Sequence, residues 1–257
     1  MLARPAAGVP GPGSGVAVAV ALTAGRLYAL VPCAGSGQRA GTAVPKQYQP
    51  VAGRAVVAHT LAALAAVPEL AATLVVLAAD DTRFRAAVPG FEGERGWVAP
   101  VGGATRAASV AAGLQALRAR GATADDWVLV HDAARCLLRP QWVRQLVQAC
   151  AGDPVGGLLA MPLADTLKQA GALAPDGAER IAQTVPRQGK WLAQTPQMFR
   201  LGLLQRALAA AGDAVTDEAG AVEALGLAPR LVPGPLENFK LTWPADFALA
   251  ERLLETR

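Results

Sequence analysis

The stretch that decides the fold reads Leu27-Tyr-Ala-Leu-Val-Pro-Cys-Ala-Gly-Ser-Gly-Gln-Arg-Ala40, a short apolar run that leads directly into a glycine-rich loop. Leu27–Val31 has the length and apolar character of a buried strand. In the loop, glycine lets backbone N–H groups face an anion without obstruction by a Cβ atom. Layered α/β sheets bind their ligands at the carboxyl ends of their strands, where this loop stands.

Strand-like and helix-like segments alternate downstream of this stretch. The pattern predicts further strands at Thr73–Ala78, Trp97–Val101, Trp127–His131 and Gly156–Met161. It predicts helices at Ala55–Ala66, from near Thr82 behind an Asp81 cap, at Arg106–Ala119 and from Pro140 to about Cys150. Such alternation means parallel strands joined by crossover helices. We therefore expect an α/β fold with a Rossmann-like layered, mostly parallel sheet and flanking helices.

The alternation is interrupted over Leu163–Lys190. A turn at Pro175-Asp176-Gly177 separates two short strand-like runs, which predicts a protruding β-arm rather than a crossover. The alternation then resumes with expected helices at Leu201–Ala211, Asp217–Leu225 and Ala245–Leu254 and a last strand at about Glu237–Thr242.

Composition excludes several classes of protein. Among 257 residues, 53% are hydrophobic and 17% charged, and 24 basic against 20 acidic residues give a net charge of +4. Disorder would need low hydrophobicity and high net charge. Lys and Arg form no run of the kind that binds polyanions, so we expect no nucleic acid partner. Three cysteines and two histidines fit neither a zinc site nor a disulfide framework, which favours a reducing cytoplasm.

The first 25 residues differ from the rest. They are rich in Pro, Gly and Ala and predict a flexible leader, with a cleaved secretory signal as the alternative. The apolar run Val16–Leu22 is seven residues long, whereas a membrane-spanning helix needs about 20. We expect no membrane partner and one domain over residues 26–257, with the arm at about 163–190.

The glycine loop by itself admits several interpretations. It lacks the Gly-Lys-Ser/Thr ending of a Walker A loop. Gly35, Gly37 and Ala40 match the spacing of a dinucleotide loop, but the next acidic residue is Glu69, behind a whole predicted helix. A purely structural turn remains an alternative. Two cations near the loop, Arg39 and Lys46, favour a triphosphate, whose charge they could neutralise during transfer.

Asp132 stands immediately after a predicted buried strand, where a functional carboxylate is expected. A carboxylate together with triphosphate oxygens is a common way to hold Mg²⁺. The alternative is that Asp132 caps the segment that follows. Arg135, three residues on, could contact a substrate, whereas His131 is expected to pack at the strand end without a role.

Several motifs together resemble those of one family. Pro32 to Arg39 followed by Pro45-Lys-Gln-Tyr48 resembles the signature of the sugar-phosphate nucleotidyltransferases, and among them the chain is most similar to the 2-C-methyl-D-erythritol 4-phosphate cytidylyltransferases. The further matching motifs, in the family's order, are Val101-Gly-Gly-Ala-Thr-Arg-Ala-Ala-Ser109, Val130-His-Asp-Ala-Ala-Arg135, Ala164-Asp-Thr-Leu-Lys168, Trp191-Leu-Ala-Gln-Thr-Pro-Gln197, Thr216-Asp-Glu-Ala219 and Glu237-Asn-Phe-Lys240. The resemblance covers about residues 26–257.

The resemblance implies roles for individual residues. The implied catalytic cations are Arg39 and Lys46, and the implied metal ligand is Asp132, which also contacts substrate. The implied nucleotide-binding residues are Cys33, Ala34, Gly35, Gly37, Gly103 and Ser109. The implied substrate-binding residues are Asp132, Arg135, Thr166, Arg187, Thr195 and Lys240. Ala104-Thr105 departs from the family, which commonly has acidic residues there, and Cys33 stands where Ala is usual.

The implied reaction transfers CMP from CTP to methylerythritol phosphate, with Mg²⁺ as cofactor and pyrophosphate as the second product. The implied assembly is a homodimer in which the arm, bearing Thr166 and Arg187, reaches into the partner; the alternative for the arm is a loose intramolecular hairpin. Two other functions stay open here: a ribitol 5-phosphate cytidylyltransferase and a non-catalytic nucleotide-binding protein. Cys33, beside the loop, is expected to show some sensitivity to alkylation.

Overall fold

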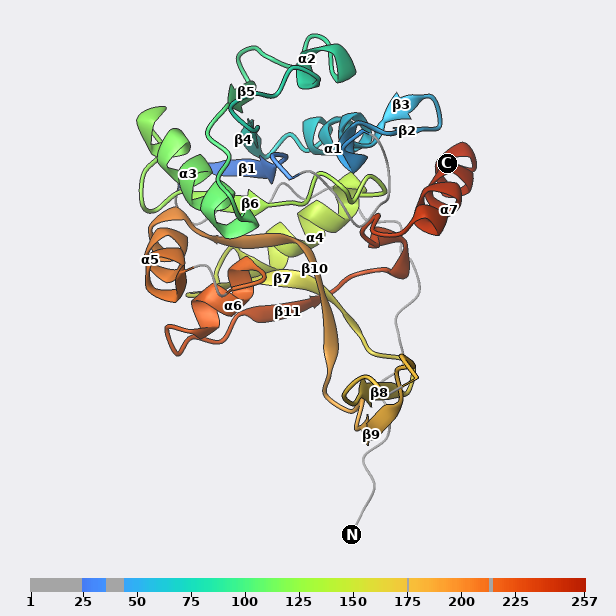
Figure 1. Cartoon of the computed structure of the whole chain (residues 1–257). Helices are drawn as coiled ribbons and strands as arrows, with labels where there is room; N and C mark the ends of the chain where they lie inside the picture. Colours follow the sequence, from blue (N-terminus) through green and yellow to red (C-terminus); the bar gives the residue numbers. More distant parts are fainter. Residues whose placement is uncertain (1–24, 36–43, 175, 213–214) are drawn as a thin grey trace.

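The computed structural model describes residues 25–35, 44–174, 176–212 and 215–257. A seven-stranded sheet in the order β11-β7-β10-β6-β1-β4-β5 runs through its centre (Figure 1). Its strands are β1 (Leu27–Pro32), β4 (Leu70–Val76), β5 (Gly96–Ala99), β6 (Trp127–Val130), β7 (Gly156–Pro162), β10 (Trp191–Arg200) and β11 (Arg230–Pro233). β2 (Pro50–Val51) and β3 (Arg54–Ala55) form a small antiparallel pair beside it.

The predicted α/β class is confirmed. β1 lies between β4 and β6 and is parallel to both, β5 is parallel to β4, and β11 is parallel to β7. β10 runs antiparallel to its two neighbours, β6 and β7. The sheet is therefore mostly parallel, and the carboxyl ends of β1, β4, β5 and β6 lie at one edge.

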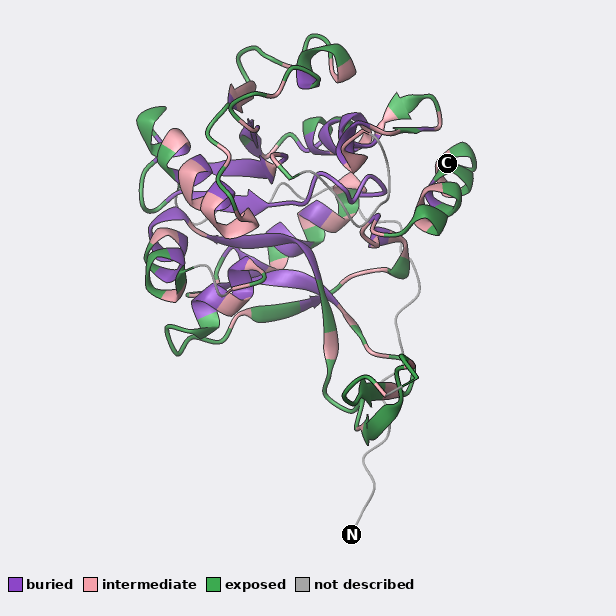
Figure 2. Ribbon diagram, viewed as in Figure 1, coloured by how far each residue is buried: buried purple, intermediate pink, exposed green. Residues whose placement is uncertain are grey.

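Helices cover both faces of the sheet because alternate strand residues point to opposite sides. In β1, Leu27, Ala29 and Val31 pack into the core on one face, while Tyr28 and Leu30 pack into the core on the other. The first face is covered by α1 (Val56–Ala65) and α4 (Pro140–Cys150), and the second by α3 (Arg106–Ala119), α5 (Leu201–Ala211) and α6 (Glu218–Glu223). Figure 2 shows the buried strands between these layers. The remaining helices are α2 (Phe84–Ala87) and α7 (Pro244–Glu255).

Two features of the sheet differ from the sequence prediction. The strand expected at about Glu237–Thr242 is wrong: Leu236–Asn238 is a short 3-10 helix, and the strand of this region is β11. The segment instead packs across the loop after β6, where the Leu241 N–H donates to the Ala134 carbonyl over 2.9 Å. β10 was not predicted, because Pro196 cannot donate to a ladder; a register shift between Ala193 and Gln197 accommodates it.

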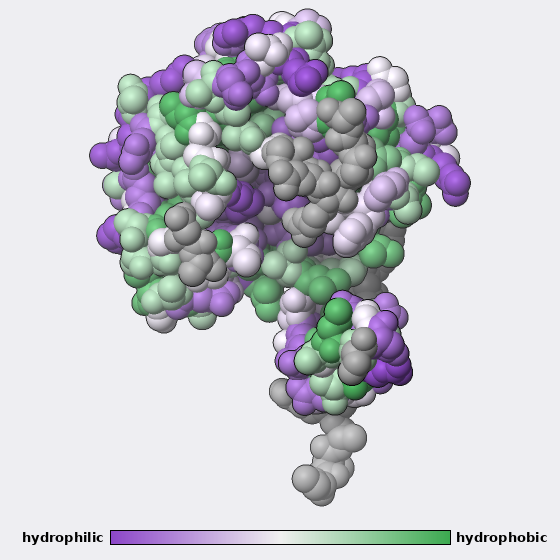
Figure 3. Space-filling view, viewed as in Figure 1, coloured by the Kyte–Doolittle hydropathy of each residue, from purple (hydrophilic) through white to green (hydrophobic). Residues whose placement is uncertain are grey.

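The arm is present as a hairpin. β8 (Leu167–Ala170) and β9 (Ile181–Val185) pair antiparallel in a two-stranded sheet of their own. In Figure 1 this hairpin projects away from the body. Leu173 and Ile181 are 67% and 65% exposed on it, and Figure 3 shows green hydrophobic surface on the arm.

The leader expected over residues 1–25 lies, except for Gly25, outside the described residues. Within the described residues, the structure contains no helix with both the length and the apolar character needed to cross a membrane.

Candidate active site

A cavity of about 430 Å³ lies at the carboxyl edge of the sheet. It is formed by the segments that follow β1, β5 and β6, together with Lys46 and Lys240 from elsewhere in the chain. The lining residues are Pro32, Cys33, Ala34, Gly35, Lys46, Gln47, Gly103, Ala104, Thr105, Arg106, Ser109, Asp132, Ala133, Ala134 and Lys240. Of the residues given roles from the sequence, this cavity brings together Cys33, Ala34, Gly35, Lys46, Gly103, Ser109, Asp132 and Lys240. The predicted residues Gly37 and Arg39 lie outside the described residues.

The start of the glycine loop is held by Gln47, a residue that the sequence interpretation gave no role. Gln47 is 5% exposed, and its Nε2 donates to the Cys33 carbonyl over 3.0 Å and to the Gly35 carbonyl over 2.8 Å. Its neighbour Lys46 donates from Nζ to the Leu241 carbonyl over 2.9 Å. The Pro-Lys-Gln segment therefore holds the first residues of the loop, Cys33 to Gly35, and places a cation beside them.

Cys33 is among the residues that line the cavity, and its side chain is buried. The residue is 2% exposed, and Sγ lies 3.9 Å from the Tyr48 hydroxyl. Burial raises the pKa of the Cys33 thiol to about 12. Because the thiolate is the reactive form, this burial argues against the expected sensitivity to alkylation.

The segment from Gly103 to Ser109 is organised around the start of α3. The Gly103 N–H donates to Ser109 Oγ over 3.1 Å, and Ser109 Oγ donates to the Thr105 carbonyl over 3.0 Å. Thr105 Oγ1 accepts from the Ala108 N–H over 3.0 Å, so Thr105 is the N-cap of α3. Thr105, one of the two residues that depart from the family's usual sequence, thus caps α3 at the rim of the cavity.

Asp132 is the carboxylate of the cavity, and three cations surround it. Arg106 Nε lies 2.8 Å from Oδ1, Lys240 Nζ lies 2.8 Å from Oδ2, and Arg135 Nε lies 3.8 Å from Oδ2. Burial alone would raise the pKa of Asp132, but these three charges, Arg106 first, hold it well below its usual range. Asp132 is therefore ionised throughout the physiological range.

Arg106 and Glu218 are site residues that sequence reasoning missed. Both Nη atoms of Arg106 bond the Glu218 carboxylate, over 2.6 and 3.0 Å. Burial favours a lower pKa for Arg106, but Glu218 and then Asp132 hold that pKa above its ordinary value. Burial raises the pKa of Glu218, and Arg106 opposes this rise. The only sequence signal was that each stands inside a motif already quoted; their pairing is a property of the tertiary structure.

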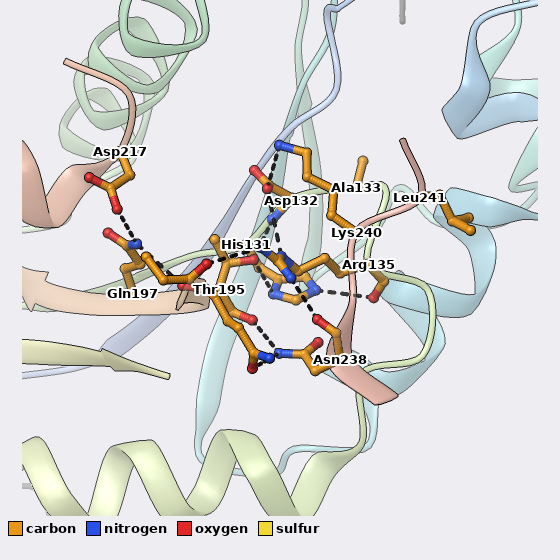
Figure 4. A network of polar contacts seen from close by, with 12 residues as sticks. His131, Asp132, Ala133, Arg135, Thr195, Gln197, Asp217, Asn238, Lys240 and Leu241 are labelled. Atoms are coloured by element: carbon orange, nitrogen blue, oxygen red, sulfur yellow. Dashed lines mark hydrogen bonds and ion pairs between the residues drawn. The ribbon is translucent and has the colours of Figure 1, made fainter. Parts of the chain in front are cut away.

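His131 packs at the end of β6, as expected. It is fully buried, and burial lowers its pKa to about 4, so it is neutral at pH 7. Nδ1 lies 3.0 Å from Thr195 Oγ1 and Nε2 lies 3.4 Å from the Arg135 carbonyl, which assigns the ring proton to Nε2. Thr195 Oγ1 in turn accepts the Asp132 N–H over 3.1 Å (Figure 4). This hydroxyl supports the Asp132 backbone.

Arg135 and Thr195 stand behind the cavity wall rather than on it. Arg135 Nη1 donates to the Asn238 carbonyl over 2.6 Å, and Asn238 Nδ2 donates to the Thr195 carbonyl over 2.8 Å (Figure 4). This network ties the loop after β6 to β10 and to the segment that carries Lys240. It thereby sets the position of Lys240 against Asp132.

Thr166 and Arg187 lie on the arm, outside the cavity of their own chain. Both are exposed, and Arg187 Nη1 donates to the Ala164 carbonyl within the arm. Neither contributes to the lining of the cavity. The predicted substrate-binding set is therefore divided between the cavity, the layer behind it and the arm.

The residues present fit a divalent cation held jointly with a ligand. Within the described residues, no three His, Cys, Asp or Glu side chains gather closely enough to hold a metal ion by themselves. Mg²⁺ is commonly held by one or two carboxylates plus substrate phosphates. Asp132 is ionised and lines the cavity, so it suits that role.

Comparison with known proteins gives consistent matches. The model of the IspD family, 2-C-methyl-D-erythritol 4-phosphate cytidylyltransferase, matches residues 27–256. The 2-C-methyl-D-erythritol 4-phosphate cytidylyltransferase of Cupriavidus pinatubonensis is 56% identical over 245 residues, which cover 90% of this chain and 95% of that protein. The bifunctional enzyme IspD/IspF of Albidiferax ferrireducens is 57% identical over 91% of this chain, and the match spans 54% of that longer relative, about half its length.

Solved structures agree in fold and in extent. A crystal structure of 4-diphosphocytidyl-2C-methyl-D-erythritol synthase has a TM-score of 0.77 and 39% identity, covering 90% of this chain and 99% of that one. The 2-C-methyl-D-erythritol 4-phosphate cytidylyltransferase from Thermus thermophilus has a TM-score of 0.66 and 34% identity, covering 88% of this chain and 98% of that one. On the family match and these likenesses, the chain belongs to the 2-C-methyl-D-erythritol 4-phosphate cytidylyltransferase family.

Proposed function

We propose that the cavity beside the glycine loop binds CTP and methylerythritol phosphate and joins them. The chain is a cytidylyltransferase of isoprenoid precursor synthesis: it transfers CMP from CTP to 2-C-methyl-D-erythritol 4-phosphate and releases pyrophosphate. One observation carries the assignment to this cavity: three cations, Lys46, Arg106 and Lys240, line it together with the ionised Asp132. Arg106 and Lys240 contact Asp132 directly. Such a charge set suits two phosphate-bearing ligands.

The reaction needs positioning and charge neutralisation more than proton transfer. The attacking phosphate oxygen of methylerythritol phosphate is already anionic, so no strong general base is required. It attacks the α-phosphorus of CTP, and the bond to the departing pyrophosphate breaks in line. Arg39 and Lys46 are proposed to neutralise the charge that develops on the phosphates. This fits the neutral His131, which faces Thr195 and not the cavity.

The nucleotide is proposed to lie along the loop and the start of α3. Cys33, Ala34, Gly35 and Gly37 would cradle the triphosphate, and Gly103 and Ser109 would contact the nucleoside. Mg²⁺, with Asp132 as its protein ligand, would neutralise phosphate charge and orient the triphosphate. Lys240, already 2.8 Å from Asp132, is proposed to hold the attacking phosphate. Thr195 and Arg135, which lie behind the cavity wall, support Asp132 and Lys240.

The arm is proposed to serve a homodimer. Thr166 and Arg187 lie outside their own cavity, so a second copy is needed if they are to reach a substrate. An apolar groove of about 550 Å³ adjoins Lys240, and its wall includes Leu236 and Trp243, which are 71% and 60% exposed. The arm itself exposes apolar side chains of the kind that such a groove would cover.

Mixed dimers test this arrangement. Lys46→Ala removes a cation of the cavity, and Arg187→Ala removes one of the arm, so each homodimer should be nearly inactive. In a co-expressed mixture, half of the dimers are mixed and each restores one of its two sites, which predicts about a quarter of wild-type activity. An arm that serves its own chain would restore none.

The acceptor is tested directly by pyrophosphate release. With CTP and Mg²⁺, we expect fast release with methylerythritol phosphate and slow release with ribitol 5-phosphate. Pyrophosphate release with ribitol 5-phosphate and none with methylerythritol phosphate would identify the chain as a ribitol 5-phosphate cytidylyltransferase instead. Tight CTP binding without release for any acceptor would indicate a non-catalytic nucleotide-binding protein.

Residues 26–257 are proposed to act as one domain that works in the cytoplasm. The two larger of the three hydrophobic cores in the described residues lie on opposite faces of the same sheet. The three cysteines, Cys33, Cys136 and Cys150, are free and buried, which suits a reducing compartment.

A further inference from the structure

Glu218 is a buried carboxylate for which the proposed reaction has no use. It is 0% exposed, begins α6 and is not among the residues that line the cavity. It belongs to the motif Thr216-Asp-Glu-Ala219, to which no role has been given. A buried charge is costly unless it is paired, so its partner is informative.

The partner is Arg106, which joins Glu218 to Asp132. The guanidinium donates from both Nη atoms to Glu218, over 2.6 and 3.0 Å, and from Nε to Oδ1 of Asp132 over 2.8 Å. A guanidinium is planar, and a bidentate carboxylate fixes that plane. Glu218 therefore decides which edge of Arg106 faces Asp132.

Glu218 is itself held in place through β10. Gln197 Oε1 accepts from the Ala219 N–H over 2.8 Å. Gln197 Nε2 donates to Asp217 Oδ2 over 2.9 Å (Figure 4). Asp217 Oδ1 accepts from the Gly220 N–H over 2.9 Å and caps α6. The start of α6 is thus anchored on both sides of Glu218.

The consequence concerns the second oxygen of Asp132. With Glu218 occupying its two Nη atoms, Arg106 reaches Asp132 through Nε and bonds Oδ1 alone. Oδ2 is then left for Lys240, at 2.8 Å. Without the charge of Glu218, we expect the guanidinium to rotate, to donate from two nitrogen atoms to both oxygens of Asp132, and to displace Lys240.

We propose that Glu218 is a positioning residue, which acts through Arg106 to keep Oδ2 of Asp132 available to Lys240 and the ligands of the cavity. The proposal rests on the proposed function of the cavity. It predicts that Glu218 governs turnover although it touches neither substrate.

The test uses Glu218→Gln with Glu69→Gln as the matched control. Glu69 is partly buried, where Glu218 is fully buried, and it also pairs with an arginine, Arg144, over 3.4 Å, away from the cavity. We expect Glu218→Gln to lower kcat at least about tenfold, because misplaced reacting groups cost rate, with the KM for CTP changed less than about threefold. Glu69→Gln should keep wild-type kcat. A wild-type kcat in Glu218→Gln would overturn the proposal.

A double-mutant cycle separates positioning from a general loss of folding. In an Asp132→Asn background, Glu218→Gln should lower kcat less than about twofold further, because its effect passes through Asp132. A full additional tenfold loss would overturn the proposal and leave the function standing. Absence of turnover in the wild type with methylerythritol phosphate would contradict the proposed function instead.

A crystal structure of Glu218→Gln decides the geometry independently of activity. We expect the Arg106 guanidinium to bond both oxygens of Asp132 and Lys240 to have left Oδ2. An Arg106 in its present orientation would overturn the proposal, whatever the acceptor proves to be.

Discussion

Gly102 packs so closely against Ala34, at the start of the glycine loop, that we expect one added methyl group to disturb CTP binding. A Cβ atom on Gly102 would lie 2.3 Å from the Ala34 Cβ and 2.8 Å from the Leu77 carbonyl oxygen. Carbon atoms pack at about 3.5–4.0 Å, so Ala34 and Gly102 would have to part by about 1.2–1.7 Å. Gly102 cannot retreat freely, because its N–H donates to that same Leu77 carbonyl over 2.8 Å.

The expected effect of Gly102→Ala is large on catalysis and moderate on folding. A misplacement of about 1 Å costs about a hundredfold in rate, which corresponds to about 3 kcal/mol of transition-state stabilisation. Overpacking should cost about 1–3 kcal/mol of unfolding free energy. We therefore expect kcat/KM for CTP to fall about a hundredfold while the protein still unfolds cooperatively.

The assay is pyrophosphate release at varied CTP, with urea unfolding measured on the same preparations. Gly152→Ala is the control, because a Cβ atom there meets nothing within 4 Å and the residue is not among those that line the cavity. The steric reasoning would be refuted by a Gly102→Ala protein with a wild-type kcat/KM for CTP, or by an equal loss in Gly152→Ala.

Three further predictions concern single side chains. Lys46→Ala should lower kcat about 10²–10³-fold with little change in thermal unfolding; retained turnover would remove Lys46 from the mechanism. With its pKa at about 12 instead of 9.0, Cys33 should react with a disulfide reagent about a thousandfold more slowly than a free thiol until urea unfolds the chain; equal rates before and after unfolding would count against its burial. Burial lowers the pKa of His131 from 6.5 to about 4, so the unfolded chain binds a proton that the folded chain refuses. The free energy of unfolding should therefore fall by about 3 kcal/mol as pH drops from 6.5 to 4. In urea titrations, the unfolding free energy of His131→Gln should fall less steeply over this range. An equally steep pH dependence in the variant would contradict this.

Much of the fold could be predicted because its signals are local. The apolar run before the glycine loop is β1, and Pro140 is the first residue of α4. Asp81 precedes α2, which begins at Phe84 and not near Thr82, and its Oδ1 accepts the Phe84 N–H over 2.9 Å. β10 was not predicted because Pro196 lies within it. Its pairing with β6 and β7 also depends on contacts between residues far apart in the sequence.

The candidate site could be predicted in part for the same reason. The loop, Lys46 and Asp132 stand in segments whose residue types suggest phosphate chemistry, whereas Ser109 was expected only from the resemblance to the family. The pairing of Arg106 with Glu218, which are 112 residues apart, leaves no pattern in a local window. The depth at which Thr195 and Arg135 lie was equally invisible, since burial is a property of packed layers.

The sequence by itself determined the alternating layers, the loop at the end of β1 and the set of charged residues available for two phosphates, because each depends on residue type and short spacing. Only the tertiary structure decided which of those charges meet. Asp132 follows the end of β6 in the middle of the sheet. Arg106 and Lys240 reach it from distant segments, and Arg135 from its own loop. In the low dielectric of the interior, their distances of a few ångströms fix its ionisation and its orientation, and no linear pattern encodes those distances.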